Sequence, residues 1–337
     1  MSEHSLIKPP LVVAGISLPH AAILAPMSGV TDLPFRRAVR RCGGGLVVTE
    51  MVASAAVLQQ VRSEMRKLKT AAVEEAPLSV QLAGWDPQTM AEAARLCEGL
   101  GATFIDINMG CPAKKVTGKL SGSALMRDPH LAAAIMHSVK SAVSVPVTLK
   151  MRLGWDENSL NAAEFGRIAE DTGLSMLAVH GRTRCQMYQG AADWKQIASV
   201  VDAVSIPVIA NGDIRCPDTA LQAIAASGAA GVMVGRGAQG RPWLLAQIGD
   251  VLAGRKMRPI PTIRERQALM RMHLDDMIAH YGPAAMRLAR KHIAWYAHGL
   301  PGAAELRDCA NNSIDASRVF AAVDKFFEDL YQRAEAA

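Results

Sequence analysis

Aromatic residues are scarce in this chain, since Phe, Trp and Tyr together make up only 4% of its 337 residues. Aliphatic side chains and alanine must therefore build the core. The 50% hydrophobic share is enough for a sizeable core, and it excludes a generally disordered chain. The length suits one large domain with a smaller one beside it.

Cysteine pairs and long apolar runs are also missing. None of the six cysteines forms a CxxC pair or joins a closely spaced Cys/His set, which argues against a zinc site or a disulfide framework. The N-terminal stretch lacks a signal-peptide pattern, and no uninterrupted apolar run reaches the roughly 18 residues of a membrane span. We therefore expect a cytoplasmic protein with reduced thiols, no metal and no membrane partner.

Acidic residues are outnumbered, and the formal net charge is +6. A chain of this charge suits a polyanionic partner such as nucleic acid. A solvated basic surface explains the same excess equally well, so charge alone leaves both interpretations open.

Eight short apolar runs recur along the first two thirds of the chain, each ending in polar residues or glycine. They span residues 22–27, 45–51, 78–84, 104–110, 147–153, 176–182, 207–213 and 231–237. Such runs are typical of strands buried on both faces, and alanine-rich segments with helical periodicity lie between most of them. The pattern predicts an α/β fold, a (β/α)₈ TIM barrel. An open doubly wound sheet is the alternative, but no GxGxxG follows the first run.

The pattern changes after about residue 245, where helical segments follow one another without strands. We therefore predict a catalytic barrel domain over residues 1–245 and a small all-helical domain over residues 246–337. Residues 254–262 resemble a linker between them.

Polar side chains and glycines stand where the predicted strands end. These candidates are Pro26, Met27, Ser28, Gln81, Asn108, Cys111, Lys150, Arg152, His180, Arg182, Asn211, Gly212, Asp213, Gly235 and Arg236. Any one of them could be a capping or satisfied core residue. Because the carboxyl ends of barrel strands meet at one mouth, the whole set predicts a ligand site there.

The ends of the last two strands indicate a phosphate site. In "ANGDI" and "MVGRGAQGRPW", glycines let the backbone approach a ligand, and Arg236 can pair with an anion. Lys150 and Gln81 suit a ring with an anionic edge, since a lysine on a barrel strand neutralises negative charge and an amide serves both donors and acceptors. Reduced flavin has such an edge.

Several motifs occur in order and together resemble those of the tRNA-dihydrouridine synthases, over about residues 20–245. They are "APMSGVTDLPFRR", "VQLAG", "DINMGCPAKKV", "GSALMRDP", "TLKMRLGW", "VHGRTRCQMYQG", "ANGDI" and "GRGAQGRPW". The segment "RLARKHIAWYAHGLPGAAELR" resembles the helical domain of the B branch of that family. Ser28 stands where alanine is expected, and Gly237 where another small residue is common.

The resemblance implies FMN at the mouth of a TIM barrel and a tRNA-binding helical domain. Pro26, Met27 and Ser28 would line the flavin, Gln81 and Lys150 would hold its ring, and His180 would lie near it. Asn211, Gly212, Asp213, Gly235 and Arg236 would hold the ribityl-phosphate, while Asn108, Arg152 and Arg182 would contact the substrate. The implied reaction is the reduction of a uridine in the D-loop of tRNA to 5,6-dihydrouridine, with NADPH as reductant.

Cys111 would supply the proton in this reaction. Reduced FMN would give a hydride to C6 of uracil, and the anion that remains needs a proton at C5. A thiol with a pKa near 8.5 is still mostly protonated at neutral pH and can act as the acid. Lys114, Lys115 and Lys119 would stabilise the thiolate, so we expect their ammonium groups to face RNA phosphates instead. Without its motif, Cys111 would be interpreted as a small buried hydrophobe.

The helical domain carries a basic stretch, because no acidic residue lies between Asp276 and Glu305. We predict that Arg287, Arg290 and Lys291 contact RNA, and that Trp295 and Tyr296 belong to the core. A stacked uridine must leave the RNA fold to reach a barrel mouth. A monomer is the expected state, since tRNA needs a large exposed surface.

Two other functions remain open. An FMN-dependent oxidoreductase of a free pyrimidine or small enone would turn over without RNA. A non-catalytic RNA-binding barrel would purify without flavin. The sequence does not indicate which D-loop uridine or which tRNA would be modified.

Overall fold

The structure, a computed structural model, describes residues 7–68, 76–118 and 120–335. Each of the eight predicted runs contains one strand of a closed parallel barrel. These strands are β3 (Ala22–Leu24), β4 (Val47–Val48), β6 (Leu78–Ala83), β7 (Phe104–Met109), β8 (Val147–Arg152), β9 (Met176–His180), β10 (Val208–Asn211) and β11 (Gly231–Val234). Pairing of β11 with β3 and of β4 with β6 closes the ring, which confirms the predicted TIM barrel.

Two further short strand pairings accompany the barrel. β1 (Val12–Val13) and β2 (Ile16–Ser17) form an antiparallel hairpin, and β5 (Val52–Ala53) extends the pairing along β6.

Valine, isoleucine, leucine and alanine fill the barrel, which agrees with the low aromatic content. The core therefore depends on aliphatic side chains that are almost entirely buried.

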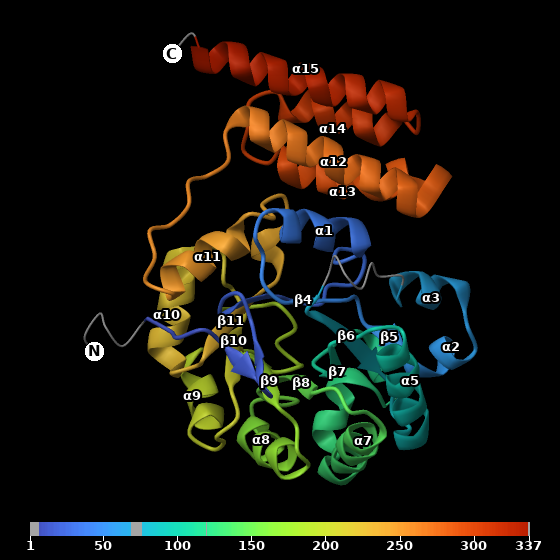
Figure 1. The fold of residues 1–337 in the computed structure, drawn as a ribbon, viewed down its shortest axis with the longest axis vertical. Helices are drawn as coiled ribbons and strands as arrows, with labels where there is room; N and C mark the ends of the chain where they lie inside the picture. The colour runs from blue at the N-terminus through green and yellow to red at the C-terminus, as the bar shows by residue number, and fades with distance from the viewer. Residues whose placement is uncertain (1–6, 69–75, 119, 336–337) are drawn as a thin grey trace.

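Helices cover the outside of the barrel (Figure 1). They are α1 (Leu33–Arg41), α2 (Ser54–Leu58), α3 (Arg62–Leu68), α5 (Pro87–Gly99), α7 (Pro129–Ala142), α8 (Ala162–Asp171), α9 (Lys195–Val201), α10 (Pro217–Ser227) and α11 (Leu244–Leu252). Short helical turns lie in the loops at α6 (Lys114–Thr117), η2 (Gly122–Arg127) and η3 (Arg236–Ala238).

Aspartates determine where several of these helices begin. The side chains of Asp32, Asp86 and Asp128 accept hydrogen bonds from backbone amides in the first turns of α1, α5 and α7. A proline follows within two residues of each cap, where its missing N–H costs nothing. These local signals start each helix shortly after a barrel strand or loop and keep the strand ends free for the mouth.

A second group of helices packs together at the C-terminal end of the chain. It consists of α12 (Ile263–Tyr281), the turn η4 (Gly282–Ala284), α13 (Ala285–Tyr296), α14 (Ala303–Asn312) and α15 (Ala316–Glu335). These helices share a hydrophobic core of their own, and Figure 1 shows them stacked beyond α1 and α11. None of the helices in the described ranges is long and apolar enough to cross a lipid bilayer.

Helix α11 packs in the barrel core through Leu245, Ile248 and Leu252. The predicted division at residues 245 and 246 runs through this helix. We propose that the two domains divide after α11, within residues 253–262.

Polar and aromatic contacts join the two domains. The hydroxyl of Tyr281 donates to the carboxylate of Asp32 over 2.8 Å, and Arg41 pairs with Asp276. Gly240 has φ +67, and a Cβ there would collide with the carbonyl of Trp295 in α13. The barrel backbone therefore meets the helical domain directly.

Asp250 at the end of α11 fixes the start of the linker. Its carboxylate accepts from Arg255 over 3.1 Å and from Arg258 over 2.7 Å, and Arg258 also donates to the carbonyl of Cys42. The hydrogen bonds from Arg258 outweigh burial and hold the pKa of Asp250 down at about 2.

We predict that Asp250→Asn destabilises the protein by roughly 1 kcal/mol at neutral pH. The effect is this small because both arginines are partly exposed, so that solvent screens their interaction with Asp250. A depressed carboxylate pKa contributes stability above its unfolded value, and that stability is lost as pH falls through the folded pKa. Urea unfolding from pH 7 to pH 2.5 should show the difference from the native chain shrinking below about pH 4. A constant difference across this range would contradict the assignment.

Candidate functional site

Two adjoining cavities lie at the carboxyl ends of the strands. The first has a volume of about 140 Å³ and is lined by the loops after β3, β10 and β11. The second, of about 510 Å³, reaches from the loops after β3 and β11 to the end of β7. Both are bordered by Pro26, Met27, Lys150, His180, Tyr188 and Arg236. Most of the predicted site residues therefore meet at one mouth.

The first cavity is enclosed by the two glycine-containing loops. Gly212 has φ +114 and Asp213 has φ +51, so the chain turns sharply at the end of β10. A Cβ on Gly237 would collide with the carbonyl oxygen of Ile214, and this lets the loop after β11 lie against the loop after β10. The glycines thus bring two loops together around one small space.

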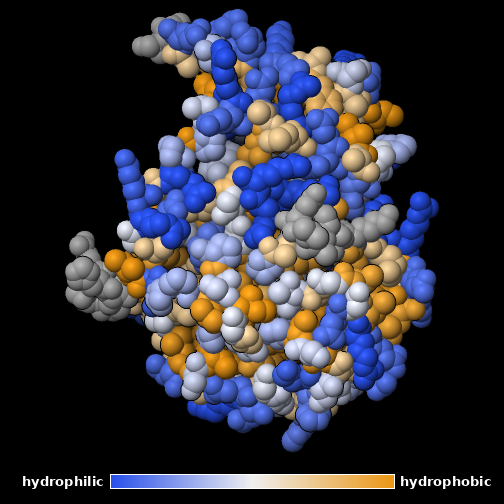
Figure 2. Space-filling view, viewed as in Figure 1, coloured by the Kyte–Doolittle hydropathy of each residue, from blue (hydrophilic) through white to orange (hydrophobic). Residues whose placement is uncertain are grey.

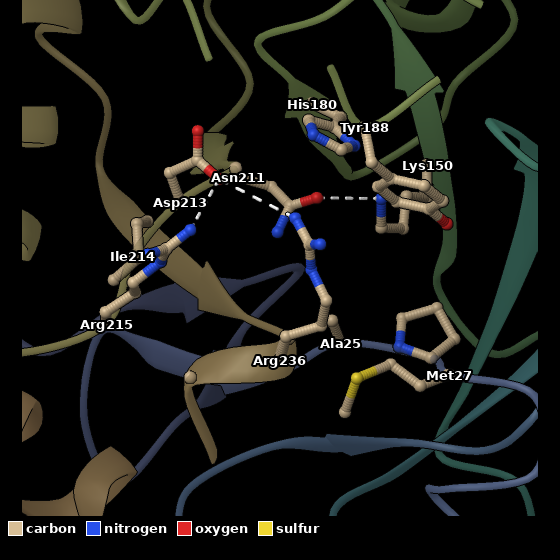
Figure 3. A pocket seen from close by; sticks show the side chains of 14 residues that line it. Ala25, Met27, Lys150, His180, Tyr188, Asn211, Asp213, Ile214, Arg215 and Arg236 are labelled. Carbon is tan, nitrogen blue, oxygen red and sulfur yellow. Dashed lines mark hydrogen bonds and ion pairs between the residues drawn. The ribbon is translucent and has the colours of Figure 1, made fainter. Parts of the chain in front are cut away.

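Arginines give the first cavity a positive charge (Figure 3). Arg215 and Arg236 lie 3.8 Å and 3.7 Å from Asp213 and remain more than half exposed. Burial would raise the pKa of Asp213, but the hydrogen bond from Arg182 and the amide of Ala192 hold it below its usual value. Arg182 takes up one oxygen of this carboxylate, so Arg215 and Arg236 keep donors for an anion.

Lys150 lies between the two cavities. Its ammonium donates to Oδ1 of Asn211 over 3.0 Å, and the amide of Asn211 donates in turn to the carbonyl of Met233. Burial lowers the pKa of Lys150 to about 8, and the charge of Arg152 adds to the effect. A buried ammonium of this kind favours a negatively charged ligand edge beside it.

A row of buried polar side chains runs from β8 to the loop after β7. The carboxylate of Asp106 accepts from Thr148 over 2.5 Å and from Gln81 over 2.7 Å. Gln81 accepts from Asn108 over 2.7 Å, and Asn108 accepts from the amide of Cys111 over 3.0 Å. Burial raises the pKa of Asp106, while both donors and the charge of Lys150 oppose the change.

Cys111 borders the second cavity at the end of this row and is partly buried. Its carbonyl accepts from the backbone amide and the hydroxyl of Ser123, which folds the loop back on itself. Lys114 is exposed at the start of α6. The side chain of Lys115 and the whole of Lys119 lie outside the described residues, so the expected direction of their ammonium groups stays a prediction.

Arg152 and Arg182 are almost fully buried and bind protein groups. Arg152 donates to the carbonyls of Gly110, Thr183 and Met187, at 2.8, 2.7 and 2.9 Å. It therefore joins the Cys111 loop to the loop after β9. Arg182 is 2% exposed and donates to Gln189, Gly190 and Asp213. Arg182 does not line the second cavity and Arg152 does, and a substrate contact by either residue stays a prediction.

His180 is buried beside these cations. Burial and the charges of Lys150 and Arg152 lower its pKa well below the usual value, which keeps the imidazole neutral. Its ring lies 6.5 Å from that of Tyr188, which borders both cavities and is half exposed. Sequence reasoning missed Tyr188, although it lies in the same "VHGRTRCQMYQG" motif as His180.

The predicted RNA-binding residues of the helical domain are placed differently from one another. Arg287 is exposed, and Arg290 donates to the carbonyl of Ala310, which joins α13 to α14. Lys291 extends to the loop after β3, since a Cβ on Gly29 would lie 3.4 Å from its Nζ. The structure therefore brings Lys291, alone of the three, to the loop that borders the second cavity.

Tyr296 is a core residue, as predicted, whereas Trp295 is only partly buried. Tyr296 is buried with its hydroxyl 3.2 Å from His273, and Trp295 packs against the barrel core. No group of three or more His, Cys, Asp or Glu side chains that could hold a metal ion exists among the residues described.

The chain matches the family model described as dihydrouridine synthase (Dus) over residues 23–333. It is 48% identical to a probable tRNA-dihydrouridine synthase of Rickettsia conorii, across 95% of this chain and 97% of the relative. It is 47% identical to tRNA-dihydrouridine synthase B of Pseudomonas aeruginosa, across 93% and 94% of the two chains.

Among solved structures, a 2-naphthoyl-CoA reductase complex aligns with a TM-score of 0.58 and 14% identity, across 96% of this chain and 70% of the other. At this identity the likeness concerns the fold alone. It agrees with the closed barrel and carries nothing about the substrate.

We predict that Arg152→Met destabilises the protein by about 3 kcal/mol, because one buried and two partly buried carbonyls lose their donor. The loop of residues 181–190 should also become susceptible to chymotrypsin, which cleaves after Tyr188. Urea unfolding and limited proteolysis measure the two effects. Arg184→Met serves as the control, because Arg184 lies over the ring of Trp155 and makes none of these three bonds. Equal protease resistance in both variants would contradict the proposed tether.

Proposed function

Because the chain belongs to the dihydrouridine synthase family, we propose that it reduces uridine in tRNA to 5,6-dihydrouridine with a bound flavin. The observation that carries the proposal is the continuity of the two cavities. Cationic loops enclose one end, Lys150 lies in the middle, and Cys111 borders the other end. The reduction of a ring needs an anchored redox group and a proton donor in one space.

The residues present fit FMN. The loops after β10 and β11 approach each other closely, and the donors of Arg215 and Arg236 suit a phosphate. Pro26, Met27 and Ser28 line the mouth beside them. Lys150 and Gln81 would hold the ring, which when bound and reduced supplies the hydride received by C6 of uracil.

Cys111 donates the proton to C5. The thiol is on a loop at the edge of the second cavity, and the buried charges of Lys150 and Arg152 are close enough to interact with it. Asn108 holds the amide of Cys111 and offers its N–H to the uracil ring.

NADPH is the reductant we propose, entering the second cavity in alternation with the tRNA. The tRNA extends from the mouth to the helical domain, where Lys291 lies nearest to the cavity and Arg287 is exposed. A uridine of the D-arm reaches the mouth once it has left the RNA fold. We expect the protein to act as a cytoplasmic monomer.

Replacing the proton donor tests the reaction. We predict that Cys111→Ala lowers dihydrouridine formation by about 10²- to 10⁴-fold on tRNA made without modifications. Mass spectrometry of the digested tRNA measures the product, and the absorbance of bound flavin should remain that of the native protein. Cys185→Ala is the matched control, since Cys185 is exposed and borders neither cavity.

Two outcomes would contradict this proposal. Full product formation by Cys111→Ala would remove the thiol as the acid. Turnover of free uridine by the native protein, with tRNA left unchanged, would favour a small-molecule reductase instead.

The charge of Lys150 should also affect the bound flavin. We predict that Lys150→Met lowers the two-electron midpoint potential of the bound flavin by about 50 mV, because a buried ammonium stabilises the reduced anionic ring. Since the pKa of Lys150 in the free protein is about 8, the difference should narrow at alkaline pH as the ammonium loses its proton. A dye-linked redox titration at pH 7 and pH 9.5 measures it. Equal potentials at pH 7 would exclude this role.

A further inference from the structure

Asp106 lies at the start of a directional hydrogen-bond chain that ends at the loop carrying Cys111. We propose that Asp106 is a positioning residue, whose carboxylate sets the direction of the Gln81 and Asn108 amides and so holds the Cys111 loop in place. The functional meaning of this role rests on the proposed reaction, in which Cys111 donates the proton. Asp106 itself borders neither cavity and acts through the two amides.

Strand register brings the first members together. Asp106 on β7 pairs with Gln81 on β6 and with Thr148 on β8. All three are nearly inaccessible, with Gln81 and Thr148 each 1% exposed and Asp106 3% exposed. Because water does not reach this layer, each polar group must be satisfied by its neighbours.

The two ends of the hydrogen-bond chain each accept only one direction of hydrogen bonding. The two carboxylate oxygens of Asp106 accept from Thr148 and from Gln81, and the backbone amides of Gly110 and Cys111 only donate hydrogen bonds. Asp106 therefore requires the Nε2 of Gln81, over 2.7 Å. The amides of Gly110 and Cys111 require the Oδ1 of Asn108, over 3.2 and 3.0 Å.

The hydrogen bond between Gln81 and Asn108, which links the two ends, has the direction that both ends require. With its nitrogen turned to Asp106, Gln81 presents Oε1 to Asn108, and Asn108 donates from Nδ2 over 2.7 Å. This leaves the Oδ1 of Asn108 free to accept from the loop. If either amide turned over, a donor would face a donor within the buried row.

The arrangement also determines what the amides offer to a ligand. The oxygens of Gln81 and Asn108 are both used inside the protein. The remaining N–H of Asn108 faces the sulfur of Met51 over 3.8 Å, and that of Gln81 is left for the second cavity, which both side chains border. A ring that presents carbonyl oxygens to this wall satisfies them, whereas an exocyclic amino group would meet a donor.

The test measures the reactivity of the Cys111 thiol in the full-length, flavin-loaded protein without tRNA. Iodoacetamide labelling at a fixed pH, followed by mass spectrometry of each cysteine peptide, gives a rate for each site. Cys185 is exposed in the loop after β9 and acts as an internal reference. Thermal unfolding of every variant records overall stability.

Asp106→Asn is the principal variant. An amide at this position can turn either its nitrogen or its oxygen to Gln81, so only the loop amides still set the direction of the hydrogen-bond chain. We expect the Cys111 loop to lose its acceptor in part of the molecules and Cys111 labelling to quicken about fivefold. The labelling rate at Cys185 should stay within about twofold of the native rate, because none of these hydrogen bonds involves Cys185.

A double variant tests the direction itself. In Asp106→Asn/Asn108→Asp, the carboxylate moves to the loop end and accepts from Cys111 and from a reversed Gln81. The amide at position 106 then donates to Gln81. We expect Cys111 labelling to return to within about twofold of native.

Thr148→Val is the matched control for a lost hydrogen bond in the same layer. It removes one donor to Asp106 and leaves the acceptor that faces Gln81. We expect a lower unfolding temperature with an unchanged labelling rate at Cys111. If Asp106 had a merely structural role, the labelling rate at Cys111 would rise as the unfolding temperature falls in every variant, including Thr148→Val.

Three results would overturn the proposal: native labelling at Cys111 in Asp106→Asn, no recovery in the double variant, or labelling that follows stability alone. Should Asp106→Asn not fold, Gln81→Met breaks the chain in its middle with the carboxylate retained. It should also quicken labelling about fivefold, and a native rate there would equally overturn the proposal. Because labelling needs neither tRNA nor turnover, its outcome is separate from whether the native protein forms dihydrouridine.

Discussion

The parallel register of the barrel determines which polar side chains become one another's partners. Gln81, Asp106 and Thr148 share one layer across three strands, and Asn108 lies beside Lys150 in the next. Since these layers are buried, every amide and charge must be satisfied from a neighbouring strand or loop. Hydrogen bonds between strands therefore fix the side chains of the mouth, and these side chains in turn bind the backbone of the loops that follow the strands.

The electrostatics of the mouth follow from the same burial. The pKa values of Lys150, Arg152 and His180 are all lowered, in each case mainly by removal from water. For Lys150 and Arg152 this is the cost of keeping charge inside, and an anionic ligand would offset part of it. For His180 the result is a neutral ring that can hydrogen-bond without adding to the positive charge. The site is thus prepared for negative charge before anything binds.

Much of this arrangement could be predicted from the sequence, because it depends on local patterns. The apolar runs indicated the eight strands, and their terminal residues indicated which side chains meet at the mouth. The roles of Arg152 and Arg182 could not be predicted in this way, since their partners are carbonyls of loops whose paths no periodicity reveals. Tyr188 was missed for a similar reason. Residues 245 and 246, where the sequence predicts the division between the domains, lie inside α11, since a helix that packs on a barrel and one that leaves it have the same local pattern.

The contact of Gly240 with Trp295 has a mechanical consequence. There the main chain of the barrel domain meets the main chain of α13, with no side chain of residue 240 between them to repack. The angle between the two domains cannot then be adjusted by a change of rotamer at this point. The separation between the mouth and α13 therefore depends on a contact between two stretches of main chain, which no rotamer change at residue 240 can lengthen or shorten.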